Sequence, residues 1–101
     1  MSLQDILTAL RQWLTEVEVS VRVQRDAPEG LWVFLETEHA LAELVAAEPE
    51  MAPYRFVSFT VLDTRLDVDS TPLFCYYDDA SSTVADILHQ LNRGMECIRA
   101  L

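Results

Sequence analysis

The stretch 61–82, VLDTRLDVDSTPLFCYYDDASS, sets five aspartates among aromatic residues and an arginine, and converging carboxylates could hold a metal ion or act as acid and base. Asp67 and Asp69 fall at the tip of a predicted hairpin, whereas Asp78 and Asp79 follow the far end of its second strand. Six strand residues span about 20 Å, so the two pairs are expected at opposite ends of a sheet. We interpret the first pair as turn formers and the second as charges that favour the positive end of the next helix.

The spacing of these residues also resembles a calcium loop in part. Asp67, Asp69 and Thr71 stand at its first, third and fifth positions. The sixth position, where a sharp turn needs glycine, is Pro72, and the twelfth is Asp78 in place of glutamate. The sequence therefore predicts no metal site here, and no cofactor elsewhere.

The remaining reactive side chains form no catalytic motif. His39 is placed in the first turn of a predicted helix, and Asp86 stands three residues before His89, where a carboxylate could orient an imidazole. No serine or cysteine accompanies either histidine in a recognisable pattern, so we predict that the protein is not an enzyme. Cys75 and Cys97 lack CxxC spacing and are interpreted as buried, reduced thiols of a cytoplasmic protein.

Composition excludes further classes of function. The net charge is −10, lysine is absent, and an acidic surface repels nucleic-acid phosphates and anionic membranes. We therefore expect neither nucleic acid nor membrane among the partners. The chain has only two glycines and no phosphate-binding loop. No apolar run approaches the roughly 20 residues that cross a bilayer.

The first half of the chain predicts a helix followed by a hairpin. Apolar residues recur at steps of three and four over 3–17, and Ser2 with Asp5 has the spacing of a capping box. Strict alternation over 17–25 predicts a strand, which a proline–glycine turn connects to a second strand at 31–36.

The second half predicts a helix, two strands and a final helix. Thr37 can cap a helix whose apolar stripe includes Ala40 and Leu44. Strands are predicted over 54–66 and 72–78. The last helix begins near Ser82 or Thr83, where Thr83 and Asp86 again have the spacing of a capping box. Gly94 weakens that helix by about 1 kcal/mol relative to alanine, so a break is conceivable there.

These elements predict one α+β domain over residues 1–101, ordered α-β-β-α-β-β-α. Its four-stranded antiparallel sheet is expected to carry helices mainly on one face, with valines and leucines beneath them. By the alternation of the strands, the opposite face is aromatic, and we predict it as the interface. Its predicted residues are Trp32, Phe34, Tyr54, Phe56, Phe74 and Tyr76. In the alternative arrangement, the last helix covers that face.

The element order and the ending LFCYYDDASSTVADILHQLNRGMECI resemble the small, acidic, dimeric chaperones of bacterial type III secretion. In that family a last strand runs through an acidic turn into an amphipathic helix. The resemblance implies a homodimer that binds an extended protein segment without catalysis. The order is also similar to that of roadblock-type dimeric regulators, which have one added strand.

We therefore expect a non-enzymatic protein-interaction module, homodimeric and chaperone-like or an adaptor, which binds a protein segment or itself through the aromatic face. Two alternatives stay open. One is a small ligand-binding or metal-assisted enzyme that uses Asp67, Asp69 or His89. The other is an acidic inhibitor that imitates nucleic acid.

Overall fold

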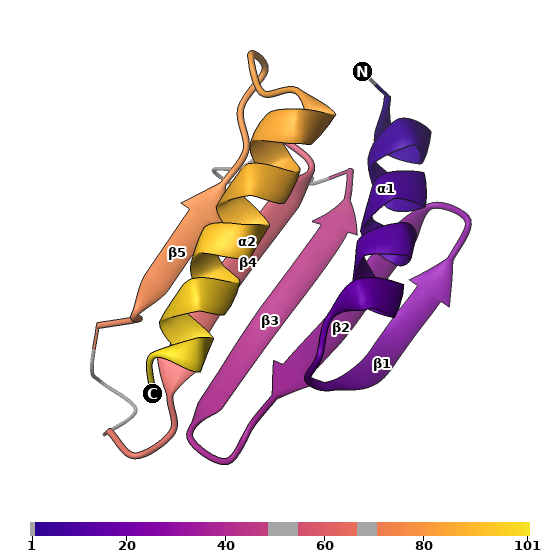
Figure 1. Cartoon of the computed structure of the whole chain (residues 1–101). Helices are drawn as coiled ribbons and strands as arrows, with labels where there is room; N and C mark the ends of the chain where they lie inside the picture. Colours follow the sequence, from indigo (N-terminus) through magenta and orange to yellow (C-terminus); the bar gives the residue numbers. More distant parts are fainter. Residues whose placement is uncertain (1, 49–54, 67–70) are drawn as a thin grey trace.

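In the part of the chain that the structure describes, two helices lie together on one face of a five-stranded antiparallel sheet (Figure 1). The structure is a computed structural model, which describes residues 2–48, 55–66 and 71–101. Its elements are α1 (Leu3–Glu16), β1 (Ser20–Ala27), β2 (Gly30–Glu36), β3 (Ala40–Ala47), β4 (Val57–Asp63), β5 (Phe74–Tyr77) and α2 (Val84–Arg99). The predicted α+β class, with helices on one face, is confirmed.

Both helices begin at the capping boxes that the sequence predicts. The Ser2 hydroxyl accepts a hydrogen bond from the Asp5 amide, and the Asp5 carboxylate accepts one from the Ser2 amide. Thr83 and Asp86 make the same reciprocal pair at the start of α2. Each box satisfies two amides that have no partner within the helix. The break considered at Gly94 does not occur, because α2 runs through it without interruption.

The strands follow one another across the sheet in chain order. The proline–glycine turn connects β1 to β2 as predicted, with Ala27 opposite Gly30. β1 begins at Ser20, three residues later than the alternation suggests. Every neighbouring pair is antiparallel, so short loops suffice to join the strands.

The predicted second helix is wrong, since its residues form β3 at the centre of the sheet. The Thr37 amide donates to the carbonyl of Ala40 at 3.0 Å, which closes a tight turn after β2. The segment ALAELVAA favours a helix by its composition, but both of its edges pair here with neighbouring strands. Its small alanines also let α1 lie close to the sheet. The order is therefore α-β-β-β-β-β-α, with five strands instead of four.

The core lies between the helices and the sheet. α1 packs on β3, and α2 packs on β4 and β5. The helices contribute Ile6, Leu7, Leu10, Trp13, Ile87, Leu91, Met95 and Ile98 to it. The two helices also meet directly, because the Trp13 indole donates to the side-chain oxygen of Asn92 at 3.0 Å. Within the described residues, no helix is long and apolar enough to span a membrane.

The resemblance to type III secretion chaperones stays a prediction. The element order on which it was based includes a helix where the structure has β3. The other part of the resemblance is the ending, and there β5, an acidic loop and α2 do follow one another.

Candidate functional site: the open face of the sheet

The face of the sheet opposite α1 and α2 is covered by no helix that the structure describes (Figure 1). Strand register determines which side chains share that face. We call this surface the open face. It comprises Ser20, Arg22, Arg25, Trp32, Phe34, Glu36, Leu41, Glu43, Val45, Ala47, Ser58, Thr60, Leu62, Cys75 and Tyr77.

A row of paired residues crosses the middle of the open face. It runs Arg22, Phe34, Glu43, Thr60, Cys75 from β1 to β5. The Arg22 guanidinium lies 4.8 Å from the centre of the Phe34 ring, within the range of a cation–π contact. The row therefore has a cation over an aromatic ring at one end and a thiol at the other.

The neighbouring row contains the largest exposed ring of the face. Trp32 lies between Arg25 and Val45, and the row ends at Tyr77 on β5. Trp32 and Tyr77 are 41% and 46% exposed, which is unusual for such large side chains. The Trp32 indole donates to a Glu43 carboxylate oxygen at 2.9 Å, so its polar atom is satisfied while its ring stays accessible.

A hollow of about 240 Å³ lies beside these rows. It is lined by Phe34, Leu41, Glu43, Thr60 and Leu62. Sites for drug-sized molecules measure about 300–1,000 Å³, so this hollow is below that range. It is better suited to one apolar side chain of a partner.

Charges on the open face cancel, in contrast to the rest of the protein. Arg22 and Arg25 balance Glu36 and Glu43, whereas the whole chain carries −10. Arg22 is also paired directly with Glu36 at 2.6 Å. The open face is thus a neutral, largely apolar area on an acidic protein.

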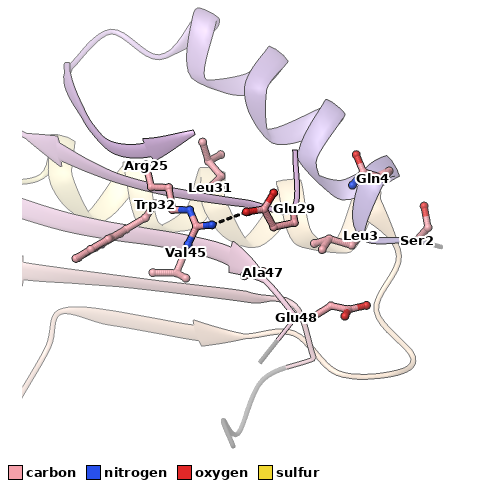
Figure 2. A pocket seen from close by; sticks show the side chains of 11 residues that line it. Ser2, Leu3, Gln4, Arg25, Glu29, Leu31, Trp32, Val45, Ala47 and Glu48 are labelled. Carbon is pink, nitrogen blue, oxygen red and sulfur yellow. Dashed lines mark hydrogen bonds and ion pairs between the residues drawn. The ribbon is translucent and has the colours of Figure 1, made fainter. Parts of the chain in front are cut away.

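A larger pocket of about 710 Å³ continues from the open face around the start of β2 (Figure 2). Trp32 and Val45 line it from the open face, and Leu31 and Leu3 line it from the helix side. Arg25 at its rim is ion-paired with Glu29. Because the pocket wraps around the end of the sheet, it extends the open face and is not an enclosed reaction site.

The structure divides the six aromatic residues that the sequence assigned to one face. Trp32 and Phe34 lie on the open face, as predicted. Phe56 is buried in the core, and Phe74 and Tyr76 point toward the helices. Tyr54 lies outside the described residues.

The assignment of the last strand was wrong by one residue. Phe74 pairs with Val61 and Tyr76 with Phe59, both of which are core residues. Cys75 therefore reaches the open face and is exposed, so it is not the buried thiol we expected, and Cys97 is half-buried. Both alternating sets of the FCYY segment contain an aromatic residue, so hydrophobicity alone could not choose between them.

Hydrogen bonds to the Asp78 side chain help to hold β5 in this register. Its Oδ1 accepts hydrogen bonds from the amides of Phe56 and Val57, at 2.7 and 2.8 Å, and its side chain is almost fully buried. Its Oδ2 is also buried and has no hydrogen-bond partner among the described residues. We had expected Asp78 to stabilise the next helix, but it joins the start of β4 to the end of β5. No local sequence motif distinguishes Asp78 from the neighbouring aspartate.

Asp79 remains on the surface next to it. Its carboxylate accepts hydrogen bonds from the Ser81 hydroxyl and amide, which lower the pKa of Asp79 together with a bond from Ser82. These bonds order the loop that leads to α2. Asp78 and Asp79 therefore have separate structural roles.

The two histidines lie on separate elements of the fold. Asp67 and Asp69 lie outside the described residues. His39 lies in the turn between β2 and β3, 3.9 Å from the Glu38 carboxylate, and His89 is exposed on α2. Within the described ranges, no group of three or more histidine, cysteine, aspartate and glutamate side chains could hold a metal ion.

Comparisons of this chain with protein-family models, with curated proteins and with solved structures found no match.

Proposed function

We propose that this protein is a non-enzymatic, chaperone-like interaction module that binds an apolar, extended segment of another protein on the open face. The observation that carries the proposal is a sheet face that bears Trp32, Phe34 and Leu62 without a covering helix among the described residues. An accessible apolar area of this kind is typical of a protein-binding surface.

The chemistry of the face indicates the kind of segment it would bind. Trp32 and the hollow beside Phe34 and Leu41 offer apolar contacts, and the balanced charges place no net field on the segment. Aromatic residues and arginine are the side chains that most often dominate binding energy in interfaces. The net charge of −10 around the face favours a segment with basic residues at its ends.

A second copy stacked face to face is the other possible occupant. Five strands about 4.8 Å apart, with a mean length of about 22 Å, give a projected area of roughly 530 Å². A stable interface buries about 800 Å² on each partner. Stacking two flat faces would thus form only a weak dimer, whereas an extended segment can also enter the pocket beside Trp32.

The proposal is tested by suppression of aggregation of reduced insulin, followed by light scattering. We expect the wild-type protein to delay aggregation, and Trp32→Asp to need about tenfold more protein for the same delay, because it removes a central aromatic contact. Val23→Asp is the matched control, since Val23 is 57% exposed but points to the helix side of β1.

No delay by the wild-type protein would contradict the proposal, as would equal losses in both variants. Melting curves of both variants show whether either loss is due to unfolding. A dimer that Trp32→Asp dissociates would support the stacked arrangement instead.

A further inference from the structure

The two edges of the sheet differ in how they are protected from pairing with another strand. β1 carries Arg22, Arg25 and Asp26, and its register shifts between Val23 and Arg25. Charges and such irregularities are the usual means by which edge strands avoid further pairing. β5 at the other edge reads FCYY, has no charged residue, and pairs with β4 without a register shift.

From this edge we infer that two copies of the protein associate through antiparallel pairing of β5, which forms one continuous sheet with all helices on the same side. The inference does not depend on the proposed function of the open face. Its two supports are backbone register and charge, whereas the short length of β5 limits its strength.

Backbone register leaves Cys75 available for the pairing. The Asp78 amide donates to the carbonyl of Val57, so Asp78 belongs to the residues whose backbone faces β4. Because these groups alternate along a strand, the backbone of Cys75 faces away from β4. A two-fold axis at Cys75 then places it opposite Cys75 of the second copy, and Phe74 opposite Tyr76 of the second copy. Residues that lie opposite each other in an antiparallel pair point to the same side of the sheet, so the open faces of both copies lie on the same side.

The charges beside β5 match this antiparallel arrangement. The Arg93 guanidinium lies 6.0 Å from the Phe74 ring centre, at one end of the strand, and its hydrogen bond is to the neutral Gln90. It has no acidic partner among the described residues. Asp79 follows the other end of the strand, and the carboxylates of Asp79 and Asp86 act electrostatically on Tyr76 near that end.

Antiparallel pairing brings the basic end of one copy to the acidic end of the other. By symmetry this contact occurs twice. A parallel arrangement would instead place like charges together, which costs free energy. The charges beside β5 of one copy therefore complement those beside β5 of a second copy. For this reason we assign the edge to a second copy of the protein and not to an unrelated strand.

The short length of β5 limits the strength of the dimer. Only four residues form the strand, so few hydrogen bonds are added and the association is expected to be weak and reversible. The consequence for the molecule is that two open faces would lie next to each other on one surface.

Sedimentation equilibrium from micromolar to millimolar concentration tests the inference. We expect a concentration-dependent dimer that Arg93→Glu weakens at least about tenfold, since two attractions become repulsions. Arg99→Glu is the matched control, because it changes the net charge equally at the end of α2 and should leave the dimer intact. Trp32→Asp should also leave it intact, which separates this inference from the open face.

Two further variants test the backbone pairing itself. Cys75→Pro removes an amide that faces away from β4, so it should abolish the dimer while thermal melts show that the fold is retained. In a Cys97→Ala background, mild oxidation should link Cys75 to Cys75 of the second copy, because Cα atoms of such opposed residues lie about 5.5 Å apart. Arg93→Glu should suppress this disulfide.

A protein that stays monomeric at millimolar concentration would overturn the inference. A dimer that is insensitive to Arg93→Glu and to Cys75→Pro would do the same. If either variant unfolds, the disulfide measurement still decides, because oxidation that yields no linked dimer of the Cys97→Ala protein excludes this edge as the interface.

Discussion

Asp78 shows how one side chain can determine the register of a strand. Its Oδ1 satisfies two amides that would otherwise be unpaired at the start of β4. We expect Asp78→Ala to lower the free energy of unfolding by about 3–6 kcal/mol, because each of the two hydrogen bonds to its carboxylate contributes about 1.5–3 kcal/mol. Asp78→Asn retains an acceptor and should cost less. Urea denaturation measures both.

Asp79→Ala is the control for this prediction. Asp79 is exposed and its hydrogen bonds stay within its own loop, so a loss below about 1 kcal/mol is expected. Equal losses at Asp78 and Asp79 would show that the buried bonds to β4 are not the source of the stability.

The ion pair between Asp63 and Arg65 predicts a specific response to acid. Hydrogen bonds from the Arg65 side chain and then its amide lower the pKa of Asp63 to about 2, below the value of about 3.9 for an unfolded aspartate. A carboxylate with a lowered pKa stabilises the fold above about pH 4, and this contribution is lost as pH falls toward 2.

We therefore expect the melting temperature of the wild type to exceed that of Asp63→Asn at neutral pH. The difference should shrink between about pH 4 and pH 2. Thermal melts of both proteins across this range measure it, and the change in overall charge repulsion affects both nearly equally. A difference that stays constant down to pH 2 would contradict the assignment.

At the scale of the elements, α2 approaches the sheet most closely at Gly94. A Cβ added there would lie 2.4 Å from Cε2 of Phe59 and 3.1 Å from Cδ1 of Phe74. Glycine is unfavourable within a helix by about 1 kcal/mol, yet only glycine leaves room for these two rings. The close packing of α2 on β4 thus explains a residue that appeared from the sequence to weaken the helix.

Gly94→Ala should therefore destabilise the protein by about 1–2 kcal/mol, although helix propensity alone predicts a gain. Gly30→Ala is a matched control, since an added Cβ there meets its nearest atoms at an ordinary 3.5 Å and the φ angle is not positive. We expect no loss for Gly30→Ala. Chemical denaturation of both variants decides, and a more stable Gly94→Ala protein would show that the rings can move away.

β3 marks the limit of prediction from local sequence. Its alanines and leucines satisfy both the helical spacing and the alternation of a strand, so either structure could bury an apolar surface. The sheet decides between them, because β3 gains backbone hydrogen bonds from strands on both sides. β2 is joined to β3 by a tight turn and β4 follows after a longer connection, and helix propensity carries no information about pairing with either strand.

At the scale of the whole molecule, acidic and apolar surfaces are separated. The charges of the open face cancel, so most of the net charge of −10 lies elsewhere. Repulsion between the acidic surfaces opposes non-specific association, and the neutral face does not share in this repulsion. Pairing of β5 would place two such faces side by side without covering either.

Part of the candidate site could be predicted from the alternation of side chains along a strand. Alternation along β2 correctly placed Trp32 and Phe34 opposite the core, because valine and leucine on the other side left no doubt about its orientation. The FCYY segment offered no such contrast. Its Cys75 and Tyr77 therefore became part of the open face only through the register that Asp78 helps to hold.

The sequence by itself determined the two capped helices, the first hairpin, the acidic surface and the outward position of the two β2 aromatics, since each depends on neighbouring residues or on composition. Only the tertiary structure decided that β3 is a strand, which side Phe74 and Tyr76 face, and that Asp78 is buried. These features depend on hydrogen bonds and contacts between different segments of the chain, whose free energies outweigh the local preference of each segment.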